Sequence, residues 1–377
     1  MDPAARAERL AREILIVDTH IDLPERLKDK MEDVCAATPD GNFDYPRARA
    51  GGLKAAFMAI YIPASTAEGI KARQEADRLI DTVEAIASRC PDKLALARSA
   101  DEVRRVVASG RIALPLGMEN GSPVVDDLES LLYFRERGIR YVTLTHSENN
   151  GLADSSFASA RKWNGLSPFG KKVVAELNRL GIMVDVSHLS DEATRQVLEL
   201  STVPVIASHS SCRHFTPGWE RNLDDAEIRA IGAKGGVVQI NFGSMFLRAD
   251  AQRQSTESWN AIHRYLDEHE IRRGTDEARQ VRERYQKEHP TTRGDVSDVV
   301  AHIDHAVKIA GMDHVGLGSD FEGVGDLPAG LEDVSGYPNL VLALVEKGYS
   351  DQDIRKICGE NLLRVWSEVE RAAEAKR

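Results

Sequence analysis

The sequence predicts an α/β protein built as a (β/α)8 barrel, also called a TIM barrel, with a helical insertion before the last strand. Three observations lead to this prediction: short apolar runs recur along the chain, helix-like segments separate them, and the units number eight. A doubly wound open sheet is the alternative, but no Gly-rich phosphate fingerprint follows the first run. The eight runs are Ile14–His20, Ala55–Ile62, Ala113–Asn120, Ile139–His146, Ile182–His188, Val203–His209, Gly235–Gly243 and His314–Phe321.

Helix-like periodicity, with Lys, Arg and Glu on one face, fills the segments between the runs. Clear examples are Ala72–Ser88, Leu128–Arg137 and Phe169–Leu180. The segment Ser255–Pro290 breaks this rhythm, because it is long, highly charged and helix-prone. We interpret it as a helical insertion over about residues 250–292 that presents a solvated charged face. Asp351–Lys376 is typical of a closing amphipathic helix, and residues 1–377 are predicted to form one barrel domain.

Composition excludes some classes of partner. The net charge of −11 and the isoelectric point of about 5.6 argue against nucleic acid and against docking onto an anionic membrane. The mean hydropathy is −0.35, and no run of roughly 18 apolar residues predicts a membrane span. The first residues lack the basic and apolar segments of a signal peptide, so we expect a cytoplasmic protein. A small anionic substrate stays possible, because one local Arg can bind a carboxylate.

The four cysteines are scattered along the chain, and none forms a C-x-x-C pair. Free thiols in a reducing compartment are the simplest prediction. The residues are Cys35, Cys90, Cys212 and Cys358.

Polar residues stand repeatedly where an apolar run ends. Taken alone, each is a weak signal: a single His there is more often a hydrogen-bonding loop residue, and a single Asp a helix N-cap. In a closed barrel, however, all carboxyl ends of the strands lie on one face. Imidazoles and carboxylates gathered there would be costly to bury without a cation. The residues are His20, Asp22, Glu119, His146, His188, His209 and Asp320.

The pattern His20-x-Asp22 places both side chains on the same side of a strand, because strand residues alternate faces. The mixture of nitrogen and oxygen donors suits zinc, with manganese or cobalt as substitutes. Five candidate ligands exceed the needs of one catalytic zinc and suit two ions that share a carboxylate. Such a site would supply hydroxide at neutral pH and polarise a carbonyl. The signatures G-x-S-x-G, G-x-x-x-x-G-K-[ST] and H-E-x-x-H do not occur.

The segments that carry these residues resemble the membrane (renal-type) dipeptidase family, a branch of the amidohydrolase-like metal-dependent hydrolases, and the chain looks like a microbial-type member. The resemblance runs from about residue 14 to 366. The matching segments are Val17–Asp22, Gly117–Gly121, Leu144–His146, Asp185–His188, Ser208–Ser211, Arg221–Asp225, Gly316–Gly323, Gly330–Val334 and Gly359–Arg364.

The resemblance implies two Zn²⁺ ions per chain. His20 and Asp22 would hold one ion, His188 and His209 would hold the other, and Glu119 would bridge both.

The resemblance also implies roles in catalysis. His146 would contact the substrate carbonyl and stabilise the oxyanion. Arg221 would bind the terminal carboxylate of the substrate, although a surface Arg paired with Asp224 or Asp225 is the alternative interpretation. Asp320 would carry a proton to the leaving amine.

The function so implied is zinc-dependent hydrolysis of dipeptides by a hydroxide that bridges the metals, in a protein that forms a homodimer. N-acyl-amino-acid hydrolysis or lactone hydrolysis on the same site is the alternative enzyme reading. A metal-poor barrel kept as a binding module would lack a ligand, and none is missing. Secreted animal members carry a signal, a lipid anchor and disulfides, and we predict none of these here. Seven histidines are expected to be structural or solvent-facing: His214, His263, His269, His289, His302, His305 and His314.

Overall fold

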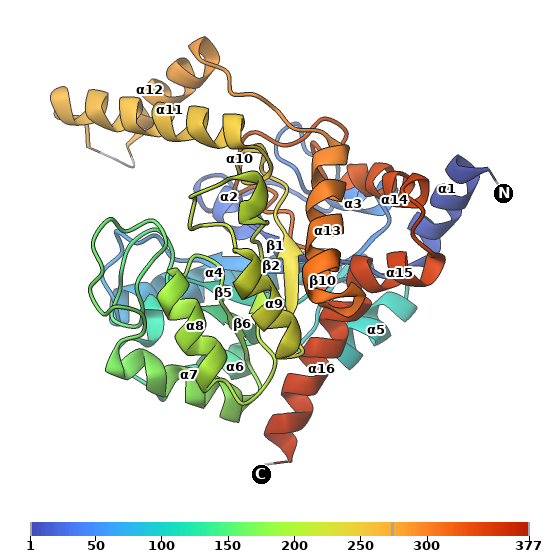
Figure 1. Cartoon of the computed structure of the whole chain (residues 1–377), viewed down its shortest axis with the longest axis horizontal. Coiled ribbons are helices and arrows are strands. Elements are labelled where there is room, and N and C mark those ends of the chain that lie inside the picture. Colours follow the sequence, from blue (N-terminus) through green and yellow to red (C-terminus); the bar gives the residue numbers. More distant parts are fainter. Residues whose placement is uncertain (1, 273–274, 376–377) are drawn as a thin grey trace.

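Parallel strands close into a barrel in the computed structural model, which describes residues 2–272 and 275–375 (Figure 1). Consecutive barrel strands pair in parallel, and Ile21 forms a parallel bridge with Phe321 in the segment after the last strand. The Asp320 N–H also donates to the His20 carbonyl at 3.1 Å, so the first and last strands meet. The predicted barrel is confirmed. Its strands are β1 (Ile16–Ile21), β2 (Leu53–Tyr61), β5 (Leu116–Glu119), β6 (Ile139–Thr143), β7 (Met183–Asp185), β8 (Ile206–Ala207), β9 (Val237–Ile240) and β10 (Val315–Leu317).

The third predicted run, Ala113–Asn120, is two strands and not one. Pro115 interrupts it, because proline has no N–H to donate to a strand ladder. The run therefore divides into β4 (Ile112–Leu114) and β5. Strand β2 pairs with both, and β4 pairs in turn with β3 (Leu94–Leu96), which extends the sheet beyond the barrel.

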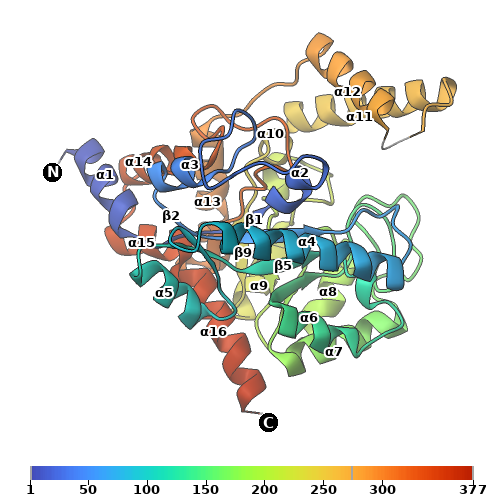
Figure 2. The ribbon, with the colours of Figure 1, turned by 180° about the vertical axis from the view of Figure 1, so that it is seen from behind.

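Helices surround the barrel (Figure 2), and the three predicted examples correspond to α4, α6 and α7, with boundaries that differ by one or two residues. No helix in the described chain is both long and apolar enough to cross a membrane. The helices around the barrel are α1 (Pro3–Glu13), α2 (Leu23–Asp29), α3 (Tyr45–Ala50), α4 (Ile70–Arg89), α5 (Ala100–Ala108), α6 (Ser130–Arg137), α7 (Pro168–Leu180), α8 (Asp191–Leu200), α9 (Asp225–Ala233), α10 (Ser244–Leu247), α13 (Val296–Ala310) and α14 (Tyr337–Glu346).

The closing helix predicted over Asp351–Lys376 is interrupted. It comprises α15 (Asp351–Arg355), a π-helical turn and α16 (Asn361–Glu374), while Lys376 lies outside the described residues. The turn contains Gly359, where a Cβ atom would meet the backbone oxygen of Leu15 at 2.4 Å. Beyond the turn, α16 packs onto the barrel interior, with the Trp366 ring centroid 5.1 Å from that of Phe57.

The predicted insertion is a helical hairpin of α11 (Ala249–Glu268) and α12 (Asp276–Glu288). Both views show it projecting from the barrel at the end of the molecule opposite α16 (Figures 1 and 2). A small separate core, made of Ile262, Leu266, Ala278 and Val281, joins the two helices.

The cysteine prediction is wrong for one pair. Cys35, after α2, and Cys90, at the end of α4, form a disulfide with a Cα–Cα distance of 6.2 Å. Their 55-residue separation leaves no local signal of the pairing, because only the packing of α4 against the preceding segment brings them together. Cys212 and Cys358 are free, as predicted, and both are buried.

Candidate metal centre

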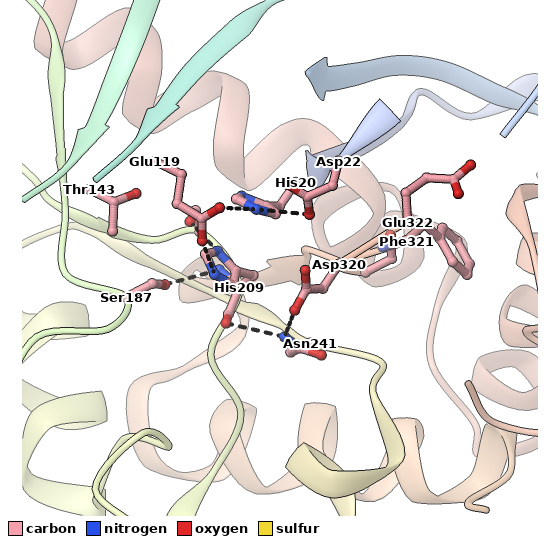
Figure 3. A network of polar contacts seen from close by, with 12 residues as sticks. His20, Asp22, Glu119, Thr143, Ser187, His209, Asn241, Asp320, Phe321 and Glu322 are labelled. Atoms are coloured by element: carbon pink, nitrogen blue, oxygen red, sulfur yellow. Dashed lines mark hydrogen bonds and ion pairs between the residues drawn. The ribbon is translucent and has the colours of Figure 1, made fainter. Parts of the chain in front are cut away.

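The carboxylate of Glu119, at the end of β5, lies at the centre of the gathered polar residues (Figure 3). Its Oε2 atom is 3.4 Å from Nε2 of His20, while its Oε1 atom is 3.1 Å from Nε2 of His188 and 3.2 Å from Nε2 of His209. One oxygen of Glu119 thus faces the β1 side of the site, and the other faces the loops after β7 and β8. This is the arrangement that a bridging carboxylate requires.

All seven predicted strand-end residues come together within three residues of strand ends. Their donor atoms form three groups, each within 4.8 Å: His20, Glu119 and His209; Glu119, His146 and His188; and His20, Asp22 and Asp320. His20 and Asp22 share one of these groups, whereas His209 shares a group with His20, and His188 shares one with His146. The structure also brings Asp320 and His146 within reach of the same positions.

The Nε2 atoms of His188 and His209 lie 2.9 Å apart, a distance that fits two nitrogen atoms facing one cation and also fits an N–H···N hydrogen bond from His188 to His209. Burial holds the pKa of both imidazoles well below its ordinary value, so both rings are neutral. The Nδ1–H of His209 donates to Ser208 Oγ, so the Nε2 atom of His209 carries a lone pair. Nε2 of His20 is buried and has no hydrogen-bond partner among the described residues. These nitrogen atoms fit metal ligation.

Hydrogen bonds behind the ligands fix their tautomers. The Nδ1–H of His20 donates to the hydroxyl of Tyr141 at 2.8 Å, and that hydroxyl donates to the Thr19 carbonyl at 3.1 Å. The Nδ1–H of His209 donates to Ser208 Oγ at 2.7 Å, and Ser208 donates to Asp185 at 2.6 Å. In both rings Nε2 is left free to face the centre, which is how metal-binding histidines are usually oriented.

Sequence reasoning missed these supporting residues. Tyr141 lies in the middle of β6, and its hydroxyl needs a polar partner because the side chain is fully buried. A tyrosine in the middle of a fully buried strand was the available signal. Asp185 and Ser208 belong to the motifs singled out above, but spacing alone does not reveal that they contact each other.

Charge at the centre favours a cation. Burial alone would raise the pKa of Glu119, yet His20 and His146 hold that pKa well below its ordinary value, so the carboxylate is ionised. Burial opposes charge on His20, but Tyr141, Glu119 and Asp22 raise the pKa of His20 well above its ordinary value. The surrounding charges therefore favour a positive charge at Nε2 of His20, which either a proton or a metal ion can supply.

Asp320 differs from Glu119 in the direction in which its pKa is shifted. Burial, and then the charge of Asp22, raises the pKa of Asp320 well above its ordinary value. Its Oδ2 atom accepts a hydrogen bond from Asn241 Nδ2 at 2.7 Å (Figure 3). A Cβ atom on Gly323 would lie 2.4 Å from oxygens of both Asp22 and Asp320, so the site requires glycine there.

The backbone is strained at two of these residues. His188 has φ +68° and Asp320 has φ +64°, both in the left-handed region that non-glycine residues rarely adopt. Such strain concentrates at functional sites, where the surrounding structure holds it in place.

His146 forms the solvent-facing edge of the centre. Its Nε2 atom is 3.6 Å from Glu119 Oε1, and its side chain is 21% exposed, more than those of the other ligands and carboxylates. Burial lowers the pKa of His146, so the ring is neutral and can donate a hydrogen bond. The ring centroid lies 4.8 Å from that of Tyr61, at the end of β2.

Arg221 is buried and does not pair with Asp224 or Asp225, so the surface-Arg interpretation is wrong. Its guanidinium donates to Ser210 Oγ at 2.7 Å and to the His209 carbonyl at 2.9 Å, and Nη2 lies 3.1 Å from Nε2 of His188. Among the described residues it forms no ion pair, and its Nε atom has no hydrogen-bond partner. Burial lowers the pKa of Arg221 to about 10, which leaves it charged at neutral pH.

The remaining histidines lie outside the centre, as predicted. His302 is fully buried between two backbone groups: its Nδ1 accepts from Cys212 N at 3.0 Å, and its Nε2 donates to the Leu247 carbonyl at 3.1 Å. His305 contacts Asp225 at 2.7 Å and stacks on His214. None of the metal-capable groups found in the described chain includes a histidine from the remaining seven.

A closed parallel barrel with imidazoles and carboxylates at the carboxyl ends of its strands defines an amidohydrolase-like, metal-dependent hydrolase. The chain belongs to the membrane dipeptidase family (Peptidase family M19), whose family model matches residues 4–377.

Solved structures of similar proteins support this membership. The probable dipeptidase PvdM from Pseudomonas aeruginosa is 30% identical, with a TM-score of 0.85 over 98% of this chain and 99% of that one. A metallo peptidase from Rhodobacter sphaeroides, solved with a phosphinate mimic of the dipeptide L-Ala-D-Ala, is 26% identical, with a TM-score of 0.78 over 94% and 99%. An amidohydrolase from P. aeruginosa, 22% identical with a TM-score of 0.74 over 96% and 98%, shares the fold.

Proposed function

We propose that this protein is a zinc-dependent dipeptidase that binds two Zn²⁺ ions and hydrolyses the peptide bond of dipeptides. The observation that carries the proposal is the buried, positively charged Arg221 beside the metal ligand His188, with no ion-pair partner among the described residues. A buried guanidinium without a carboxylate is costly unless a ligand supplies one. A dipeptide has a free carboxylate one residue away from its single peptide bond, whereas an internal peptide bond in a protein does not.

The donor set would hold the ions in two places. His20 and Asp22 would ligate one ion, His188 and His209 would ligate the other, and Glu119 would offer one oxygen to each. When bound, the ions would lower the pKa of water to near neutrality and polarise the peptide carbonyl.

The chain's own residues would then guide the reaction. Arg221 would grip the substrate carboxylate, which fixes the peptide bond over the centre. The neutral ring of His146 would donate a hydrogen bond to the carbonyl oxygen as negative charge develops there. Asp320 would accept a proton from the attacking water and pass it to the amide nitrogen, so that the C–N bond breaks to give an amine and a carboxylate. The raised pKa of Asp320 supports a group that takes up and releases a proton.

Arg221→Ala tests the proposal on a matched pair of substrates, Ala-Ala and Ala-Ala amide. Losing a charge-assisted hydrogen bond costs about 1.5–3 kcal/mol, so kcat/KM for the acid should fall about ten- to a hundredfold, and far less for the amide. Arg195→Ala is the control, because it removes an exposed Arg that pairs with Glu192 on α8. It should leave kcat/KM unchanged for both substrates. Equal losses on the acid and the amide would show that Arg221 only shapes its loop.

N-acyl amino acids also end in a carboxylate, so Arg221 fits them as well. N-acetyl-Ala should therefore be assayed beside Ala-Ala on the metal-loaded protein. Faster turnover of N-acetyl-Ala would replace the dipeptidase proposal with an N-acyl-amino-acid amidohydrolase.

A further inference from the structure

Three aromatic rings connect the metal centre to Arg221. The Phe157 ring centroid lies 5.9 Å from that of His188 and 6.2 Å from that of Trp219. Trp219 is in turn 5.1 Å from Phe246, and the guanidinium carbon of Arg221 lies 5.0 Å from the Phe246 ring centroid. We call Phe157, Trp219 and Phe246 the aromatic row. It begins beside a metal ligand and ends beside the group proposed to bind the substrate carboxylate.

Phe157 is the exposed member of the aromatic row. Its side chain is 44% exposed, although large apolar side chains are usually removed from water. Phe246 is only 5% exposed, so it supports the row from beneath. An aromatic ring facing solvent next to a catalytic centre is available for contact with a ligand.

The loop that carries Phe157 is anchored directly to two residues of the metal centre. The hydroxyl of Ser155 donates to the His146 carbonyl, and the N–H of Ser156 donates to the His188 carbonyl at 2.8 Å. The N–H of Phe157 donates to Ser155 Oγ at 3.2 Å. These contacts hold the backbone of Phe157 in place next to both histidines.

An ion pair joins the two loops that carry the exposed part of the row. Arg161 donates to Glu220, which stands between Trp219 and Arg221 in the sequence. Arg161 also donates to the Ser155 carbonyl at 2.6 Å. The ring of Phe157, the ring of Trp219 and the guanidinium of Arg221 are thus positioned by one connected set of contacts.

We propose that the aromatic row recognises a bulky apolar side chain on the carboxyl-terminal residue of the dipeptide. This inference rests on the proposed function, because Arg221 is what places that residue's carboxylate at the end of the row. The side chain beside that carboxylate then lies against Phe157 and Trp219. Contact with an apolar side chain removes the exposed Phe157 ring from water, which a glycine in that position cannot do.

Two series of dipeptides test the proposal. In the first, the carboxyl-terminal residue changes from Gly to Leu to Phe behind an amino-terminal Ala. In the second, the amino-terminal residue changes in the same way before a carboxyl-terminal Ala. The protein should prefer Ala-Phe and Ala-Leu to Ala-Gly. Phe157→Ala should reduce the ratio of kcat/KM for Ala-Phe over Ala-Gly about tenfold and leave the ratios of the second series unchanged.

Leu132→Ala is the matched control, because Leu132 on α6 is also 44% exposed and belongs neither to the centre nor to the aromatic row. It should change no ratio. Trp219→Ala should also lower the ratio of kcat/KM for Ala-Phe over Ala-Gly. Phe157→Leu should lower this ratio less than Phe157→Ala does.

Three results would overturn the proposal: equal rates for Ala-Phe and Ala-Gly in the unmodified protein, an equal loss on both in Phe157→Ala, or a change confined to the amino-terminal series. Each of these still involves dipeptide hydrolysis, so the proposed function would stand. If the metal-loaded protein hydrolyses no dipeptide in either series, the proposed function fails first.

Discussion

Tyr141 and His20 meet across the barrel, with the phenol oxygen 2.8 Å from Nδ1 of the imidazole, although β6 and β1 are not neighbouring strands. The phenol sets which nitrogen of His20 faces the centre. Tyr141→Phe keeps the ring and removes this hydrogen bond, so affinity for one of two metal ions should fall about 10–100-fold. Metal titration followed by calorimetry, with stoichiometry checked by elemental analysis, measures the effect.

Ser208→Ala is the counterpart on the other side, since Ser208 accepts from His209. Ser208→Ala should lower the affinity for the ion at His209 and leave the ion at His20 bound. If both variants weaken the same ion, or neither weakens any, the pairing of supporting residues with sites is wrong.

Glu119→Gln should weaken the binding of both ions, because Oε2 of this carboxylate faces His20 while Oε1 faces His188 and His209. Elemental analysis after reconstitution with zinc should give two ions for the unmodified chain and fewer than one for the variant. A variant that retains one ion at full occupancy would show that Glu119 serves a single site.

Asp320→Asn should separate proton transfer from metal binding. The amide is close in size to the acid and cannot carry the proton, so kcat should fall about 10²–10⁴-fold while two ions stay bound. Loss of an ion in this variant would instead make Asp320 a ligand, which its place beside His20 and Asp22 allows geometrically.

His302 should make the fold sensitive to acid. Burial lowers the pKa of His302 to about 4, below the ordinary value of 6.5. The unfolded chain therefore binds a proton there below pH 6.5 while the folded chain does not. Neutral His302 therefore contributes fully to the free energy of unfolding above pH 6.5. This contribution, up to about 3 kcal/mol, is lost as the pH falls toward 4.

Chemical unfolding of the unmodified protein and of His302→Gln, between pH 4 and 8, measures this effect. The variant should be less stable at neutral pH, because Nδ1 no longer accepts from Cys212, and its stability should fall less steeply on acidification. The two curves should run parallel above pH 7. Parallel curves below pH 6 as well would mean that His302 does not titrate as inferred. Turnover at pH 7 should stay within a few-fold.

Reduction of the Cys35–Cys90 disulfide should lower the free energy of unfolding by about 2–4 kcal/mol, because the closed loop of 55 residues restricts the unfolded chain. Urea unfolding with and without reductant measures the difference. Cys212→Ala and Cys358→Ala should respond to reductant like the unmodified protein. An unchanged midpoint in reductant would show that the disulfide contributes nothing to stability.

Sequence periodicity predicted the strands well because barrel strands are apolar and recur with regular helices between them. It also predicted that His20, Glu119 and His209 would meet, since all parallel strands of a barrel end on one face. This argument needs only the order of the elements and no knowledge of side-chain positions.

What could not be predicted depends on contacts between distant segments. Tyr141 fits a buried strand pattern that calls for some polar partner, but the pattern does not say that this partner is His20 across the barrel. Cys35 and Cys90 carry no spacing signal for a disulfide. The position of Phe157 depends on a loop with no periodicity, which hydrogen bonds to His146 and His188 hold in place.

The α11–α12 hairpin leaves and rejoins the barrel at nearly the same point. Gly294 N donates to Ser244 Oγ at 3.0 Å, and Thr292 N donates to Gln254 Oε1 at 2.6 Å, so its two ends are tied together at the base. Its own core buries Ile262 and Leu266 without help from the strands. A longer or shorter hairpin could therefore be joined at this base without moving the strand ends that carry the metal centre.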